Sequence, residues 1–216
     1  MLKNQYSGKV VKVLLTTTLI TSLLVLTGLS YSPVLAAPKA PAQVQKAESF
    51  APQTIGISLV TGPNLISLPL IPSDTAIGDI LAAIAGSVNS VWAYDPTTQS
   101  WSSWTPAIGG DLANLTDGYG YWITMTAPAT LNITGVALPD PPAVPPTYSM
   151  VTGWNLVGFK ETAIKTNAAY LTGTNYRFPI YGYAAGAYTT ISAGTENFAV
   201  GAGYWVYFNA DGIVTP

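Results

Sequence analysis

The chain has 216 residues, of which 49% are hydrophobic and only 8% are charged, and it contains neither Cys nor His. The lack of both residue types excludes disulfide bracing, thiolate chemistry, Ser-His nucleophile pairs and His-metal sites. With 10 acidic and 8 basic residues, the sequence has no basic stripe that could hold phosphates. Nucleic-acid binding is therefore not expected.

Residues 1–36 have the pattern of a secretory signal peptide. Lys3, Lys9 and Lys12 precede an apolar run from 13 to 30, and small residues end the segment at Ala36. A retained membrane anchor is the alternative, because the run is nearly long enough to span a bilayer. We expect cleavage after Ala36, so that the chain meets a membrane only through this segment and the product is secreted or cell-surface. Five basic residues then face 10 acidic ones, a net charge of −5.

The next segment, 37–54, mixes Pro, Ala, Gln and Lys without hydrophobic periodicity. This composition predicts a flexible spacer.

Two motifs occur twice in the remainder of the chain. The opening motif VTGWNLVGF at 151–159 recurs in altered form as VTGPNLISL at 60–68, and the closing motif GAGYWVYF at 201–208 recurs as GYGYWITM at 118–125. The copies lie 91 positions apart at the opening motif and 83 apart at the closing motif. This spacing indicates a folding unit of roughly 80 residues that is used twice.

We therefore predict a first β-rich repeat unit over 55–137 and a second over 148–216. A Pro-rich linker at 138–147 joins them, since such a segment cannot enter a sheet interior.

Each unit is predicted to contain an opening hairpin, one short helix and several alternating strands. The hairpins turn at 61–64 and at 152–153. The first helix begins near Ala76, is capped by Asp74 and ends at Gly86, and the second spans 166–171. The sequence thus predicts a mainly β fold, a β-rich α+β protein of two tandem antiparallel barrel-like or sandwich-like repeats.

The shared motif residues are predicted to hold each unit together. Gly153 permits a positive φ at the turn, Asn155 hydrogen-bonds to nearby backbone, and Trp154 is expected to cover the core edge. The small residues of the closing motif let the backbone pass close to a bulky group, for which we expect an aromatic ring of the opening hairpin. The residues given this structural role are Gly153, Trp154, Asn155, Gly203, Tyr204 and Trp205 in the second unit and Asn64, Gly120, Tyr121 and Trp122 in the first.

Four aromatic residues of the first unit are the candidate ligand-binding residues: Trp101, Trp104, Trp92 and Tyr94. Trp101 and Trp104 lie in a Ser-rich hairpin whose counterpart in the second unit has no Trp, which favours a role specific to one unit. Exposed aromatic rings at these positions could hold sugar rings; the alternative is that they are core residues.

No catalytic, cofactor-binding or metal-binding residue is predicted. The carboxylates available to a hydrolase are Asp95, Asp111, Asp117, Glu161 and Glu196. Most of them lie in turn or loop sequences, where acidic side chains commonly stabilise the turn.

The residues GWNLVGF at 153–159, YGY at 181–183 and GAGYWVYF at 201–208 resemble the GWN…GYW repeat domain of secreted and cell-surface proteins of bacteria, notably Chloroflexi, and archaea. The second unit matches this pattern closely, whereas the first has Pro63 where the second has Trp154. The resemblance implies a non-catalytic cell-surface module and brings no ligand residues with it.

We therefore expect an exported, non-catalytic structural or adhesion protein whose partners are other cell-surface proteins or polysaccharide. A carbohydrate-binding protein that uses the aromatic residues of the first unit is the second hypothesis. A glycoside hydrolase that relies on carboxylates alone is the third.

Overall fold

The computed structural model describes residues 51–137 and 145–216. The predicted signal peptide, nearly all of the predicted spacer and most of the predicted linker lie outside these ranges. We refer to 51–137 as the first half and to 145–216 as the second half. The prediction of a mainly β fold with few, short helices is confirmed.

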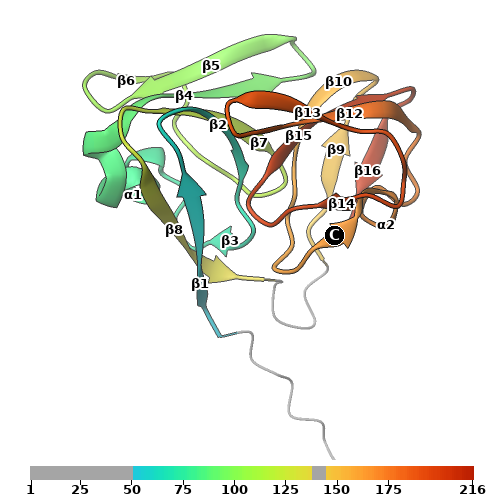
Figure 1. Cartoon of the computed structure of the whole chain (residues 1–216), viewed down its shortest axis with the longest axis horizontal. Helices are drawn as coiled ribbons and strands as arrows, with labels where there is room; N and C mark the ends of the chain where they lie inside the picture. The colour runs from blue at the N-terminus through green and yellow to red at the C-terminus, as the bar shows by residue number, and fades with distance from the viewer. Residues whose placement is uncertain (1–50, 138–144) are drawn as a thin grey trace, which may run out of the picture. The chain divides into compact units, whose positions relative to one another are not determined.

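The first half contains eight strands and a short helical segment (Figure 1). Its strands are β1 (Gln53–Leu59), β2 (Gly62–Ser67), β3 (Ile71–Pro72), β4 (Val88–Asp95), β5 (Ser100–Thr105), β6 (Gly109–Gly110), β7 (Gly120–Met125) and β8 (Ala129–Val136). The helix α1 (Ile77–Leu81) continues into the 3₁₀ turn η1 (Ala82–Ser87). The predicted cap at Asp74 is wrong: Ala76 occupies the N-cap position of α1, and no side-chain hydrogen bond caps the helix. Asp74 instead accepts from the backbone N–H of Ala76, two residues on, and so stabilises the turn that precedes the helix.

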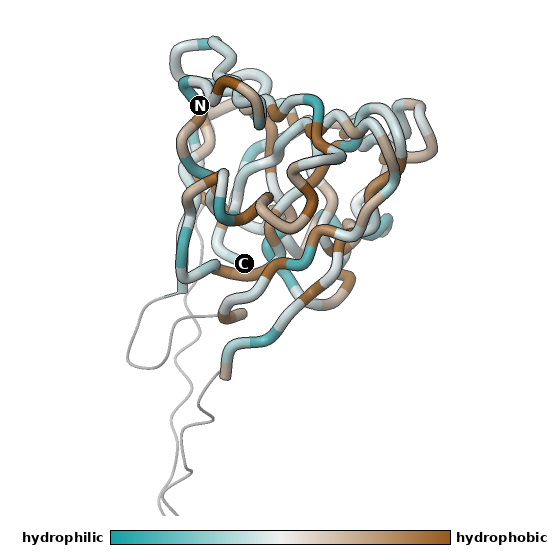
Figure 2. Tube along the Cα trace, turned by 90° about the vertical axis from the view of Figure 1, so that its left-hand side faces the viewer, coloured by the Kyte–Doolittle hydropathy of each residue, from teal (hydrophilic) through white to brown (hydrophobic). Residues whose placement is uncertain are grey.

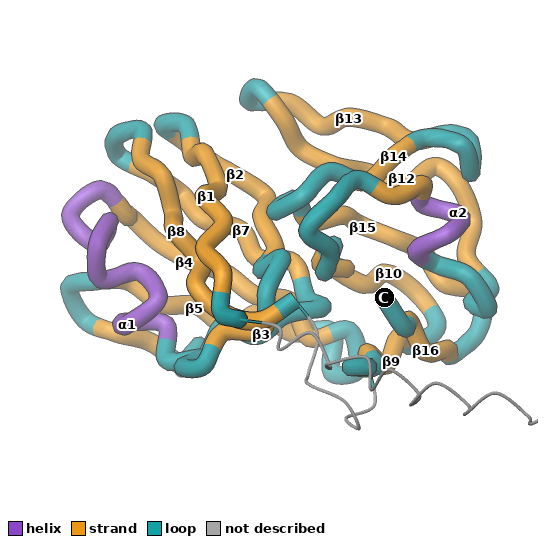
Figure 3. The backbone as a smooth tube through the Cα atoms, turned by 90° about the horizontal axis from the view of Figure 1, so that it is seen from below, coloured by secondary structure: helices purple, strands orange, loops and turns teal. Residues whose placement is uncertain are grey.

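The second half contains the remaining eight strands and one helix. Its strands are β9 (Tyr148–Met150), β10 (Gly153–Gly158), β11 (Lys165–Thr166), β12 (Tyr176–Ala184), β13 (Ala187–Ile191), β14 (Asn197–Phe198), β15 (Gly203–Phe208) and β16 (Gly212–Val214). The helix α2 (Asn167–Tyr170) is capped by Thr166, whose hydroxyl accepts from the N–H of Ala169. Figure 3 shows α1 and α2 each beside the strands of its own half.

The principal sheets of the two halves have the same order of strands. The first half has a sheet β2-β7-β4-β5-β6 and the second has β10-β15-β12-β13. Smaller sheets, β1-β8-β3 in the first half and β9-β16 in the second, share a buried core with the principal sheet of the same half and so pack against one of its faces. Apolar side chains fill a separate core in each half. In Figure 2 short hydrophobic stretches alternate with hydrophilic ones along the trace, as expected where each strand has one buried face.

The predicted opening hairpins are wrong. β1 pairs with β8 and β2 with β7, while β9 pairs with β16 and β10 with β15. The reason lies in the side chain of Asn155, which accepts from the N–H of Val151 and donates to the carbonyl groups of Val151 and Gly153. Asn64 makes the same three bonds in the first half. Because the side chain satisfies the backbone at the corner, the chain leaves one sheet for the other instead of folding back.

The two halves are joined by reciprocal backbone hydrogen bonds. The N–H of Ser67 donates to the carbonyl of Gly201 over 2.9 Å, and the N–H of Gly158 donates to the carbonyl of Gly118 over 3.0 Å. Ser67 and Gly158 occupy equivalent positions of the two opening motifs, and Gly201 and Gly118 occupy equivalent positions of the closing motifs. Each opening motif therefore bonds to the closing motif of the other half, the relation that a local two-fold axis produces.

The second glycine of each closing motif permits this approach. A Cβ atom at Gly203 would lie 2.8 Å from the carbonyl oxygen of Ile66 and 3.2 Å from the Cα atom of Gly120, and one at Gly120 would lie 2.8 Å from the side chain of Leu156. The partner of these two glycines is thus the other half, not the aromatic ring of the opening hairpin in their own unit. An aromatic ring does meet the first glycine of one closing motif, because a Cβ atom at Gly118 would collide with the ring of Tyr148, which lies in the other half.

Three further contacts across the junction occur once only, and one of them is the hydrogen bond that the hydroxyl of Tyr148 donates to the carboxylate of Asp117. The hydroxyl oxygen of the buried Ser67 lies 3.0 Å from the carbonyl oxygen of Phe159 and 2.9 Å from that of Ala202, and its single hydrogen is shared between these two acceptors. The ammonium group of Lys160 donates to the carbonyl of Ala137, and burial lowers the pKa of this lysine from its ordinary value. These bonds satisfy polar groups that the junction removes from water.

Replacement of the corner asparagines will test their structural role. Asn155 is 1% exposed, so Asn155→Ala leaves buried backbone groups without partners and is expected to lower the free energy of unfolding by about 3 kcal/mol. Asn64 is only partly buried, and Asn64→Ala should cost about 1 kcal/mol because water replaces the lost bonds. Urea denaturation measures the free energy of unfolding of both variants. Equal losses would contradict the claim that the greater burial of Asn155 makes its hydrogen bonds more important.

A methyl group at Gly203 is expected to separate the halves. Gly203→Ala should lower the free energy of unfolding by about 2 kcal/mol, because neither the Ile66 carbonyl nor the Gly120 backbone can move away freely. The control is Gly78→Ala, an exposed position in α1 with nothing within 4 Å of the new methyl group. There we expect no loss, or a gain of up to about 1 kcal/mol from helix propensity.

Candidate aromatic binding site

The outer faces of the two principal sheets are lined with aromatic side chains. In an antiparallel ladder, directly opposed residues share a face. The pairs Trp154–Tyr207 and Tyr181–Trp205 therefore lie on one face of the second sheet, while Asn155 and Val206 point into the core. The same geometry places Trp92 opposite Trp122 on the outer face of the first sheet.

Two aromatic triads connect the halves at this face. Trp205 of the second half contacts Tyr94 and Trp101 of the first, with ring centroids 5.1 and 5.9 Å apart. Trp122 of the first half contacts Tyr183 and Tyr188 of the second at 4.9 and 6.0 Å. Each triad also contains a contact between its two residues from the same hairpin, Tyr94–Trp101 in one and Tyr183–Tyr188 in the other. The Tyr94–Trp101 rings are tilted, and the other five contacts are edge-to-face, an arrangement that aromatic rings prefer. The Trp of each closing motif thus packs against a hairpin of the other half: Trp205 against β4–β5, and Trp122 against β12–β13.

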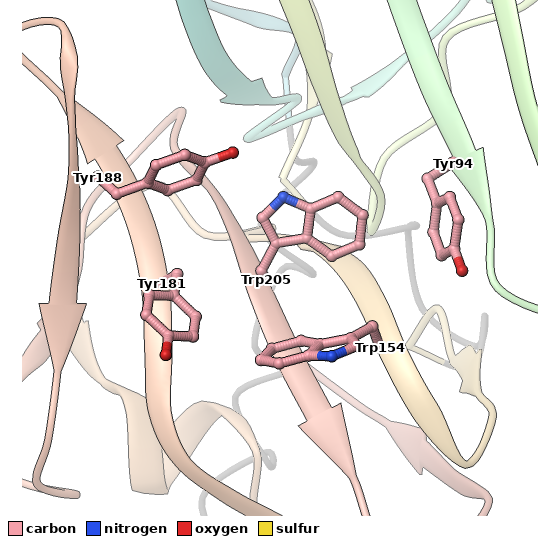
Figure 4. A pocket seen from close by; sticks show the side chains of 5 residues that line it. All are labelled: Tyr94, Trp154, Tyr181, Tyr188 and Trp205. Atoms are coloured by element: carbon pink, nitrogen blue, oxygen red, sulfur yellow. The ribbon is translucent and has the colours of Figure 1, made fainter. Parts of the chain in front are cut away.

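The larger hollow on this face, which we call the second-half pocket, has a volume of about 530 Å³. It is lined by Tyr94, Trp154, Tyr181, Tyr188 and Trp205. Figure 4 shows the Trp205 ring at the centre, with Tyr94 reaching in from β4 and the other side chains coming from strands of the second half. No charged residue lines it.

The polar tips of these five side chains are free to meet a ligand. Within 51–137 and 145–216, no hydrogen bond involves the indole N–H of Trp154 or Trp205 or the hydroxyl of Tyr94, Tyr181 or Tyr188. Trp154 and Tyr188 are also 40% and 60% exposed. The pocket therefore combines apolar ring faces with polar donors and acceptors at their rims, which is the usual composition of a small-molecule site.

A smaller hollow, the first-half pocket, has a volume of about 400 Å³ and is lined by Trp92, Trp101, Trp122 and Thr124. Trp122 is equivalent to Trp205 in the closing motif, and Trp101 is equivalent to Tyr188 as the hairpin partner of its triad. The position equivalent to Trp154 is Pro63, so this pocket lacks one aromatic wall.

The candidate ligand residues chosen from the sequence are only partly brought together. Trp92 and Trp101 line the first-half pocket and are 42% and 44% exposed, and Tyr94 lines the second-half pocket. Trp104 does not join them, because it packs against the core of the first half. A spacing of three in a strand places Trp101 and Trp104 on opposite faces.

The sequence did not lead us to the second-half pocket as a candidate site. Trp154 was assigned to the edge of the core, yet its ring lies on the outer face against Tyr181 and Tyr207. The signal available was alternation: Tyr181 and Tyr183, and likewise Trp205 and Tyr207, recur at every second position of a strand. Arg177, on the same face, stacks over the Tyr207 ring at 3.6 Å.

The five carboxylates available for hydrolysis are all engaged by nearby groups. Asp95 accepts from the hydroxyl of Thr98 and the N–H of Thr97, Asp111 from the N–H of Ser103, and Asp117 from the hydroxyl of Tyr148. The other two likewise have partners: Glu161 pairs with Lys165, and Glu196 accepts from the N–H groups of Ser192 and Ala193. None of the five lines the second-half pocket. In the described part of the chain no group of three or more His, Cys, Asp or Glu residues could hold a metal ion.

Comparisons with protein-family models, with curated proteins and with solved structures gave no match. The resemblance to the GWN…GYW repeat domain therefore stays a prediction, and the function has to be argued from the site itself. No helix in 51–137 or 145–216 is long and apolar enough to span a membrane.

Two carboxylates should resist protonation in the folded state. Hydrogen bonds from Thr98 and Thr97 lower the pKa of Asp95 below its usual value of 3.8, and bonds from Thr152 lower that of Asp211. The unfolded chain therefore takes up protons first, so stability present above about pH 3.8 is lost as the pH falls below it. An NMR titration of the side-chain carboxyls will measure this, and Thr98→Val should raise the pKa of Asp95 alone.

Proposed function

We propose that this chain is a non-catalytic adhesion module of the cell surface or extracellular matrix that binds polysaccharide through the second-half pocket. The observation that carries the proposal is the pocket itself, five aromatic side chains from both halves with no charged residue among them and with unpartnered polar tips. The proposed function joins the structural or adhesion role expected from the sequence with the carbohydrate-binding hypothesis. The main ligand site is now proposed in the second half instead of the first.

A sugar ring fits this chemistry better than a charged ligand. A pyranose has apolar C–H faces, which can lie on aromatic rings, and a rim of hydroxyl groups, which need donors and acceptors. Tyr181 and Tyr188 can supply hydroxyls at the rim, and Trp154 and Trp205 can supply indole N–H groups. Phosphate-rich ligands are disfavoured, because the chain is acidic and the pocket offers no cation.

The first-half pocket is a weaker version of the same site. Trp92, Trp101 and Trp122 provide ring faces, but Pro63 stands where Trp154 closes the second-half pocket. We therefore expect most of the affinity to come from the second half.

Replacement of Trp154 tests the proposal directly. The purified protein should be retained by at least one of cellulose, chitin, xylan, mannan and peptidoglycan in a pull-down assay. Trp154→Ala should weaken this retention at least about tenfold, equivalent to about 1.4 kcal/mol, while the thermal unfolding midpoint changes little because Trp154 is 40% exposed. The control is Ile213→Ala, an exposed residue of β16 that does not line the pocket.

A gain-of-function variant complements this test. Pro63→Trp restores an aromatic ring beside Trp122 and Thr124 and should increase retention by the first-half pocket, most visibly in the Trp154→Ala background. Failure of every polysaccharide to retain the protein, or equal retention of the parent and Trp154→Ala, would contradict the proposal.

A further inference from the structure

The strand β13 leaves one edge of the four-stranded sheet open. It pairs only with β12, through a two-residue turn in which Ala185 and Gly186 have positive φ values of 51° and 80°. In such a hairpin the residues that flank the turn, Ala184 and Ala187, exchange both hydrogen bonds, and the pairs then alternate. The backbone N–H and C=O groups of Tyr188 and Thr190 therefore point outward, away from β12.

The equivalent edge of the first half is closed. Ser103 of β5 corresponds to Thr190, and its N–H donates to the carboxylate of Asp111 over 2.7 Å while its carbonyl accepts from Leu112. The two residues that follow, Trp104 and Thr105, pair with β6. Within the described residues, no backbone bond reaches Tyr188 or Thr190 from the outer side. The two sheets thus share their strand order but differ at this edge.

The open edge also lacks the features that normally prevent strand addition. Its sequence, AYTTI at 187–191, contains no charged residue and no Pro, and its first four residues are exposed. Tyr, Thr and Ile favour extended structure. Exposed edges are commonly protected by Lys, by Pro or by a covering segment, and Figure 3 shows β13 at the rim of its sheet with no strand beyond it.

We propose that β13 pairs antiparallel with β13 of a second copy, around a two-fold axis that passes beside Thr189. The outward groups suit this occupant because they are symmetric about Thr189: Tyr188 of one copy faces Thr190 of the other, and Thr190 faces Tyr188. Each of these two pairs exchanges two hydrogen bonds, and the two Thr189 residues face each other directly. The arrangement is self-complementary and closed, so it forms a dimer and no fibre.

The dimer extends the ligand-binding face. The two four-stranded sheets become one sheet of eight strands, and a two-fold axis normal to a sheet keeps equivalent faces on the same side. Tyr181, Tyr188 and Trp205 of both copies then lie on one continuous face. This consequence, unlike the dimer, rests on the proposed function: a polysaccharide long enough to reach both second-half pockets binds with avidity.

Cysteine substitution tests the register, because the chain has no Cys of its own. Directly opposed residues of a non-hydrogen-bonded pair lie about 4.5 Å apart at Cα, within the range that a disulfide spans. Thr189→Cys should therefore form a disulfide-linked dimer under mild oxidation. The matched control is Thr190→Cys, which is equally exposed but faces Tyr188 of the second copy. It should form at least about tenfold less dimer on the same non-reducing gel.

Proline substitution tests the role of the backbone. The N–H of Thr190 is not used by β12, so Thr190→Pro should leave the sheet folded, removing one outward donor and obstructing the incoming strand. Sedimentation velocity should show a concentration-dependent dimer for the parent and for Thr190→Val. For Thr190→Pro, the dissociation constant should rise at least tenfold with an unchanged circular dichroism spectrum. If Thr190→Pro does not fold, the cysteine pair remains decisive.

Three results would overturn the proposal: a parent that stays monomeric up to about 1 mM, equal cross-linking at positions 189 and 190, or cross-linking at neither. A monomer that instead binds an added extended peptide at β13 would assign the edge to a different partner. Because none of these assays contains polysaccharide, failure of the dimer and failure of carbohydrate binding are distinguished.

Discussion

The close approach of two backbones at Gly120 and Gly203 is the constraint on which the rest of the structure depends. Each glycine leaves space for the opening strand of the other half, and the reciprocal bonds from Ser67 to Gly201 and from Gly158 to Gly118 then become possible. The outer faces of the two principal sheets are consequently brought into contact. Aromatic residues on those faces, which would otherwise be a large exposed apolar surface, bury part of their area against each other.

This arrangement explains how a chain with few charges and no disulfide can be well ordered. Each half of about 80 residues has a core of its own, but units of this size are marginally stable when isolated. The junction adds aromatic contacts, each contributing about 0.5–1.5 kcal/mol, and backbone hydrogen bonds that replace solvation by water. The contacts that stabilise the junction therefore also form the face that carries the proposed ligand site.

The class of fold could be predicted because it depends on local patterns, namely alternating apolar residues and turn sequences. The opening hairpins could not, since a turn sequence such as TGPN does not reveal that the Asn64 side chain will satisfy the corner and send the chain to another sheet. The site was half predicted for a similar reason. Trp101 could be named as a candidate because its hairpin has no Trp in the second half, but the pairing of Trp205 with Tyr94 depends on contacts between residues 111 positions apart.

The differences between the halves point to a division of roles. The first half has a closed edge at Ser103 and a pocket that lacks a wall at Pro63, whereas the second half has an open edge at Thr190 and a complete aromatic pocket. Packing alone requires neither difference, because the junction contacts of the two halves are nearly equivalent. The closing-motif Trp of each half makes the same kind of contact with the other half, whereas the positions around these Trp residues differ. The proposed ligand binding and the proposed assembly therefore both fall on the second half, and the first half contributes Tyr94 to the second-half pocket.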